Sequence, residues 1–106
     1  MRLLKALAAS STLFLSVSAV GIEVCYFSGF TDCKTITGAS GQCLFVSGPY
    51  NDHVFSARAA SGTRRCDSYN HVNNGACGSV LVQGIDQAGY SGLPSGHLTS
   101  GFVCYN

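Results

Sequence analysis

Six cysteines are the residues of this chain with the greatest capacity for covalent or metal chemistry. They are Cys25, Cys33, Cys43, Cys66, Cys77 and Cys104. No two of them are separated by only two residues, and no histidine stands at finger-like spacing from a pair, so the pattern favours disulfides over a zinc site. An even number of cysteines in a short exported chain is typical of a complete disulfide framework. We therefore expect three disulfides and no thiolate nucleophile.

A second set of residues could support acid–base chemistry on a phosphodiester. It comprises three histidines and three arginines: His53, His71, His97, Arg58, Arg64 and Arg65. The one glutamate, Glu23, lies near the start of the expected mature chain, so a general base would have to be Asp52 or Asp67. No serine lies in a Gly-x-Ser-x-Gly setting. The sequence thus predicts no catalytic residues and no enzyme, with a small secreted ribonuclease as an alternative.

The first residues have the pattern of an export signal. Arg2 and Lys5 precede an uncharged apolar run over 6–17, and small residues up to Ala19 suit a signal peptidase. The run is shorter than the ~20 apolar residues of a membrane-spanning helix, and serines interrupt it. We expect a signal peptide over 1–19, one mature domain over 20–106, a secreted, extracellular location and no membrane span.

The mature chain is nearly neutral. Beyond residue 19 its basic and acidic residues give a net charge of about −1 with the histidines neutral. Nucleic-acid binding depends largely on lysines and arginines that neutralise phosphates, and the Arg64-Arg65 pair alone is too little. We expect no nucleic-acid partner, and a monomer.

The elements that must position these residues are short strands. Beyond the signal no long stretch has apolar residues at helical spacing, and glycine, serine and asparagine recur every few residues, which predicts an all-β domain. The expected strands are 22–27, 34–37, 42–47, 54–59, 63–69, 79–83 and 98–105. The segment 83–96 between the last two strands has few large apolar residues. It is predicted to be either a flexible loop or an exposed binding loop that presents Ile85, Tyr90 and Leu93.

A weak internal repeat divides the mature chain into halves of about 22–62 and 63–106. A shift of 44 residues places Cys33 on Cys77, His53 on His97 and Ser56 on Ser100. Equivalent hairpins should close alike. The repeat therefore predicts disulfides that join Cys25 to Cys33, Cys66 to Cys77 and Cys43 to Cys104.

The segment Asn51-Asp52-His53-Val54-Phe55-Ser56 resembles the βγ-crystallin calcium signature, which has two Asn/Asp residues, two variable positions, a Ser/Thr and a Ser. An aromatic hairpin opener, Tyr26-Phe27, lies upstream of it. The chain is most similar to small cysteine-containing crystallin-like proteins that fungi secrete. This resemblance implies two Greek-key motifs packed as a β-sandwich and stabilised by three disulfides.

The resemblance also implies where calcium would bind, and the residues depart from the family pattern there. Phe55 replaces a hydroxyl residue, and the second-half counterpart, 95–100, has no Asn or Asp. Calcium takes six to eight oxygens. We expect no required cofactor and at most a weak calcium site on Asn51, Asp52 and Thr99. In the alternative, Asn51 and Asp52 only turn the chain while Ser56 holds the corner by a hydrogen bond to the backbone.

Export, small size and the lack of a catalytic set favour a non-enzymatic binding protein. The resemblance implies an effector or a killer-toxin-like protein that acts on an extracellular or cell-surface target of another organism. A protease inhibitor on the same scaffold is the first alternative, because inhibition is also known among crystallin-like domains.

Overall fold

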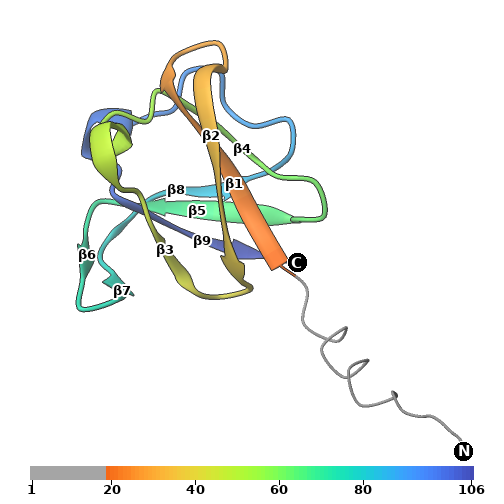
Figure 1. The fold of residues 1–106 in the computed structure, drawn as a ribbon, viewed down its shortest axis with the longest axis vertical. Helices are drawn as coiled ribbons and strands as arrows, with labels where there is room; N and C mark the ends of the chain where they lie inside the picture. The colour runs from red at the N-terminus through yellow and green to blue at the C-terminus, as the bar shows by residue number, and fades with distance from the viewer. Residues whose placement is uncertain (1–18) are drawn as a thin grey trace, which may run out of the picture.

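The computed structural model describes residues 19–106, and these form an all-β domain of two main antiparallel sheets and a two-stranded hairpin (Figure 1). The first sheet has the order β2-β1-β4, made of Thr31–Ala39, Ala19–Phe27 and Ser56–Ala59. The second sheet has the order β3-β9-β5-β8, made of Cys43–Phe45, Gly101–Tyr105, Arg65–Tyr69 and Val80–Ile85. Residues 1–18 of the expected signal peptide lie outside the described residues. Its last residue, Ala19, is the first residue of β1.

The core lies between the two sheets, whose strands cross at a steep angle (Figure 1). In β1, Val20, Ile22 and Val24 are buried while Glu23 between them is only half-buried, as expected for a strand with one face on the core. Phe102 of β9 is the largest fully buried side chain. The period-two pattern of β1 thus fixes which face of the first sheet turns inward and leaves Glu23 on the outer face.

Each half of the chain contributes one segment to the sheet of the other half. β3, from the first half, pairs with β9, and Tyr90, from the second half, forms an isolated bridge with Ala57 of β4. Both halves repeat one order of elements: two strands, a short third segment, a 3₁₀ turn and a last strand. The turns are η2 (Gly48–Tyr50) and η3 (Gly96–Leu98). The two sheets are therefore linked by backbone hydrogen bonds as well as by core packing.

Every predicted strand overlaps an observed one, and the sequence missed one small hairpin. β6 (Val72–Asn73) and β7 (Ala76–Cys77) are joined by Asn74 and Gly75, which both have positive φ. An Asn-Gly pair with this geometry favours a tight two-residue turn. Asn74 and Gly75 are therefore the tip of an added hairpin between β5 and β8.

All six cysteines are paired, as predicted, but only one of the three predicted disulfides is present. Cys25–Cys33 is confirmed, whereas the predicted Cys66–Cys77 and Cys43–Cys104 pairs are wrong. The observed pairs are Cys43–Cys77 and Cys66–Cys104. Cys66 stands opposite Cys104 on adjacent strands, while the β6–β7 hairpin carries Cys77 to β3, where Cys43 lies.

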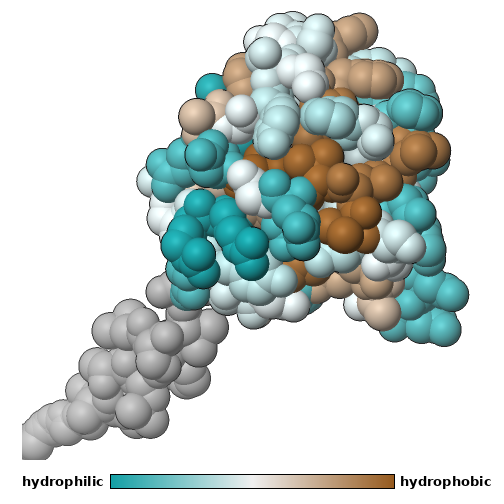
Figure 2. Space-filling view, turned by 180° about the vertical axis from the view of Figure 1, so that it is seen from behind, coloured by the Kyte–Doolittle hydropathy of each residue, from teal (hydrophilic) through white to brown (hydrophobic). Residues whose placement is uncertain are grey.

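The surface leaves four large apolar side chains exposed among residues 19–106: Phe27, Phe45, Val80 and Leu98. Figure 2 shows one face of the molecule, where apolar side chains gather across the middle and polar side chains surround them. Of the four, Phe27 is the one that packs edge-to-face on another aromatic ring within the described part. In these same residues no helix has the length and hydropathy needed to cross a membrane.

Candidate functional site

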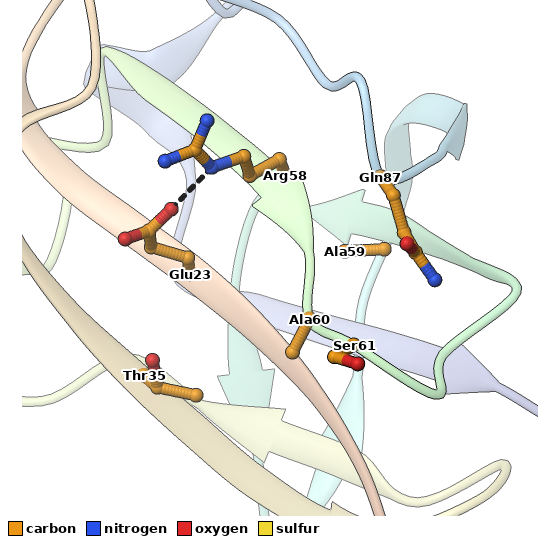
Figure 3. A pocket seen from close by; sticks show the side chains of 7 residues that line it. All are labelled: Glu23, Thr35, Arg58, Ala59, Ala60, Ser61 and Gln87. Carbon is orange, nitrogen blue, oxygen red and sulfur yellow. Dashed lines mark hydrogen bonds and ion pairs between the residues drawn. The ribbon is translucent and has the colours of Figure 1, made fainter.

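A polar pocket of about 370 Å³ opens on the outer face of the first sheet (Figure 3). Its centre is a row of three side chains across the sheet, because Glu23 of β1 stands opposite both Thr35 of β2 and Arg58 of β4. The rest of the lining comes from the end of β4 and the segment after β8: Ala59, Ala60, Ser61 and Gln87. We call this site the polar pocket.

Two contacts hold the Arg58 guanidinium at the pocket. Its Nε donates a hydrogen bond to Glu23 Oε1 at 2.5 Å, and its Cζ lies 4.3 Å from the centre of the Phe30 ring. Both side chains of the ion pair are partly exposed, so the pair contributes little to stability. Its main effect is to fix the direction of the guanidinium.

The wall opposite β2 is also fixed by hydrogen bonds. Gln87 Nε2 donates to the Thr63 carbonyl oxygen, and the Asp86 carboxylate accepts from the N–H groups of Ala88 and Gly89. Gly89 has a φ of +69°, and a Cβ there would lie 2.4 Å from Arg58 Cβ. Only glycine lets this segment pass so close to the arginine.

A second surface is formed by aromatic rings beside the β1–β2 hairpin. Tyr26 stacks on His53 with 5.2 Å between ring centres and packs edge-to-face on Phe27 and Tyr50. Phe55 packs edge-to-face on His53 at 6.0 Å. We call these five residues the aromatic surface. Phe27 and His53 are its exposed members, and Phe27 has 54% of its area exposed.

Two charged residues flank the aromatic surface at Tyr50. The Lys34 ammonium lies 4.7 Å from the centre of the Tyr50 ring, and the Tyr50 hydroxyl donates to Asp32 Oδ1 at 3.3 Å. Partial desolvation, and then the Asp32 charge, raise the pKa of the Tyr50 phenol above its ordinary value of 10.0. Tyr50 is therefore neutral and a hydrogen-bond donor at physiological pH.

The predicted calcium residues are brought together, but two of their side-chain oxygens already take part in hydrogen bonds. The Asp52 N–H donates to the Thr99 carbonyl oxygen, and Asp52 Oδ1 accepts from the Ser100 hydroxyl. The buried Thr99 hydroxyl donates to the Ser95 carbonyl oxygen. Asn51 Oδ1 is buried and has no partner within residues 19–106. The donor set therefore fits calcium only in part: one orphaned amide oxygen and one shared carboxylate.

The turn interpretation of the same segment agrees with the geometry. Asp52 has a φ of +63°, a conformation that Asp tolerates better than most residues. Ser56 is fully buried, and its hydroxyl donates to the Phe27 carbonyl oxygen and accepts from the Phe30 N–H. Ser56 thus holds the corner of the β1–β2 hairpin, as the sequence suggested.

The expectation that the segment 83–96 presents Ile85, Tyr90 and Leu93 to a partner is corrected by the structure. Ile85 ends β8 and is fully buried, Leu93 is 5% exposed, and Tyr90 exchanges two backbone hydrogen bonds with Ala57. In so small a domain the isolated apolar residues of a polar segment serve as anchors to the core. The side chains of Ile85 and Leu93 are not available to a partner.

No protein-family model, curated protein or solved structure matches this chain. The family and the function must therefore be argued from the site and the fold.

The histidines proposed for the ribonuclease alternative do not meet at the polar pocket. None of His53, His71 and His97 lines it. Among residues 19–106, the one cluster of potential metal-binding side chains is Glu23 with Cys25 and Cys33, whose sulfurs are joined in a disulfide. Glu23 is the only member of that cluster outside the disulfide, and its Oε1 accepts a hydrogen bond from Arg58.

Sequence reasoning missed the polar pocket. Glu23 and Arg58 are 35 residues apart, and Gln87 comes from a segment predicted to be a loop. The alternation of polar and apolar residues in β1 was a usable signal, since it places Glu23 on the outer face. The Greek-key resemblance implied that the fourth strand lies beside the first, but it gave no register, so it did not place Arg58 opposite Glu23.

Proposed function

We propose that this protein is a secreted, non-enzymatic binding protein built on a crystallin-like β-sandwich. In a Greek key the fourth strand returns to lie beside the first. β4 lies beside β1, and β9 lies beside β5. The short third segment of each half joins the opposite sheet, which packs the two motifs together. This order supports the resemblance drawn from the Asn51-Asp52 signature.

Export is supported by the disulfides. Three disulfides in a domain of this size are typical of extracellular proteins. Signal cleavage after Ala19 would leave Val20, whose side chain is 1% exposed, as the first residue of the mature chain. Protein from the culture medium should begin within about two residues of Val20, and an intact Met1 would contradict export by this signal.

The aromatic surface is the observation that carries the binding function. Tyrosine and other aromatic residues are enriched at binding hot spots, because their rings bury a large area at a small entropy cost. Here the rings of Tyr26 and His53 are already fixed against each other, so binding would order few additional side chains. A surface of this kind favours a macromolecular target over a small substrate.

The target in this proposal lies outside the producing cell, on the surface of another organism, and the protein acts there as an effector or toxin. The proposal is tested with purified, disulfide-bonded protein on bacterial, yeast and plant cells. Labelled protein should bind to or injure one of these cell types. Loss of signal in reducing agent would be expected, because the scaffold depends on its disulfides.

A matched pair of variants connects this activity to the aromatic surface. Phe27 and Phe45 are almost equally exposed, at 54% and 55%, but Phe45 lies on β3 in the other sheet. Phe27→Ala should weaken binding by about tenfold or more, and Phe45→Ala should leave it unchanged. Inhibition of an extracellular protease without cell binding would favour the inhibitor alternative, and RNA cleavage by the purified protein would overturn the proposal.

A further inference from the structure

We propose that the polar pocket binds a neutral saccharide unit. This inference goes beyond the proposed function, because the pocket is lined by none of the residues of the aromatic surface. It rests on the chemistry of the lining, on its charge balance and on the way the lining is held in place.

The lining offers both donors and acceptors, as a polyhydroxylated ligand requires. Within residues 19–106, no hydrogen bond occupies the two terminal nitrogens of Arg58, the second carboxylate oxygen of Glu23, or the hydroxyl of Thr35. Ser61 adds another exposed hydroxyl, and Gln87 adds an amide oxygen, since its nitrogen is used by Thr63. Vicinal hydroxyls of a sugar can donate to a carboxylate while they accept from a planar guanidinium.

The charge of the pocket favours a neutral ligand over an ion. Arg58 is its only basic residue and Glu23 its only acidic one, and the two are in contact. An anion at the guanidinium would be repelled by the neighbouring carboxylate, and a cation at the carboxylate would be repelled by the guanidinium. A ligand that carries no charge but many hydroxyls satisfies both groups.

The shape and rigidity of the pocket agree with this ligand. Its volume of about 370 Å³ is near the lower end for small-molecule sites, which suits one or two sugar units. The methyl group of Ala60, which is half-buried next to the end of β4, gives a small apolar patch for the C–H face of a sugar ring. Arg58, held by Glu23 and Phe30, loses little freedom on binding.

The test is a ¹⁵N NMR titration of the intact, disulfide-bonded protein. The probes are neutral tetrasaccharides of glucose, mannose, galactose or N-acetylglucosamine, each added to about 10 mM, a concentration that detects millimolar affinity. At least one should shift the amide signals of Thr35, Ala60, Ser61 and Gln87. Sodium sulfate at the same concentration serves as the anionic probe and should leave these signals unmoved.

Two variants and one control localise the binding. Thr35→Trp fills the rim of the pocket, and Arg58→Lys keeps the charge but removes the planar donor pair; each should weaken binding by about tenfold. Thr37→Trp is the control, because Thr37 is exposed on the same face of β2 but does not line the pocket. The NMR spectrum of each variant reports its folding, and Thr35→Trp alone tests the site if Arg58→Lys does not fold.

Three outcomes would overturn the saccharide site. They are no shift with any tetrasaccharide, shifts at the pocket with sulfate instead, and saccharide shifts confined to the aromatic surface. The proposed function has a separate test, because cell binding that depends on Phe27 does not require the polar pocket. Failure of the saccharide test would therefore leave the proposed function in place.

Discussion

Cys66 lies directly opposite Cys104 on the neighbouring strands β5 and β9, with 4.0 Å between their Cα atoms, and the two form a disulfide. This bond joins strands that are already paired, so it reinforces the second sheet. Cys43–Cys77 instead ties β3 to the β6–β7 hairpin across 34 residues of chain. Peptide mapping under non-reducing conditions should recover these two pairs and Cys25–Cys33.

The Cys43–Cys77 and Cys25–Cys33 disulfides should differ in what they contribute to stability. Replacing Cys43 and Cys77 by alanine should lower the free energy of unfolding by about 4 kcal/mol, and replacing Cys25 and Cys33 by about 2.5 kcal/mol, because the longer loop loses more entropy when closed. The closed loops span 34 and 8 residues. Denaturant unfolding of the two double variants measures the difference, and the reverse order would contradict the loop-entropy argument.

The Ser56 hydroxyl should be essential for the β1–β2 hairpin. Ser56→Ala leaves the Phe27 carbonyl and the Phe30 N–H without their partner, and each unsatisfied buried group costs about 1–3 kcal/mol. We expect a loss of about 2–4 kcal/mol in the free energy of unfolding. Ser28→Ala, at an exposed position of the same hairpin, should change it by less than about 0.5 kcal/mol. Equal effects of the two substitutions would exclude this role for Ser56.

The sequence carried enough information for the strands and too little for their partners. The alternation in β1 and the glycines between strands follow from local geometry, so every strand was located except the two of the small β6–β7 hairpin. The cysteine pairing failed because Cys66 is not the repeat equivalent of Cys25; a shift of 44 residues takes Cys25 to Tyr69. The β6–β7 hairpin, absent from the first half, then moves Cys77 away from β5.

Some contacts of the candidate sites were predicted from the sequence and others were not, because most of them join segments that are distant in the chain. The contact of Asp52 with Thr99 was anticipated because a family pattern links the two halves. The polar pocket depends on the register that places Glu23 of β1 opposite Arg58 of β4, and neither a local pattern nor the Greek-key resemblance gives that register. The segment 83–96 was misjudged because local polarity outweighed the burial of Ile85 and Leu93, which is decided by tertiary packing.

Tyr50 should titrate at higher pH than an ordinary tyrosine. Its pKa is raised first by desolvation and then by Asp32, so the fold favours the protonated phenol. The stability that this group contributes is present below pH 10.0 and is lost as the pH rises through the higher pKa of the folded state. Phenolate absorbance, read as the difference between the protein and its Tyr50→Phe variant, gives the midpoint.

Asp32→Asn should move the Tyr50 midpoint down without restoring the ordinary value, because desolvation is the larger cause. Asp86→Asn is the matched control: it removes one negative charge from a residue that does not contact Tyr50. A midpoint that responds equally to both substitutions would show that only net charge matters.

Calcium should bind weakly and change stability little. Calcium takes six to eight oxygens, and here Asp52 already accepts from Ser100, the Thr99 hydroxyl is engaged with Ser95, and Phe55 has no oxygen to offer. Such a site belongs near a dissociation constant of ~10⁻³ M, so millimolar calcium adds less than about 1 kcal/mol. The melting temperature with calcium should therefore exceed that with chelator by less than about 8 °C.

One feature favours a higher calcium affinity than this. Asn51 Oδ1 is buried and has no hydrogen-bond partner within residues 19–106, and a bound metal ion would supply that partner. Melting curves of the protein and of Asp52→Asn, each with calcium and with chelator, decide between the two. A calcium-dependent rise above about 10 °C that disappears in Asp52→Asn would show a real site on Asn51 and Asp52. A small rise that is unchanged in the variant would leave the segment as a turn, with the disulfides as the main source of stability.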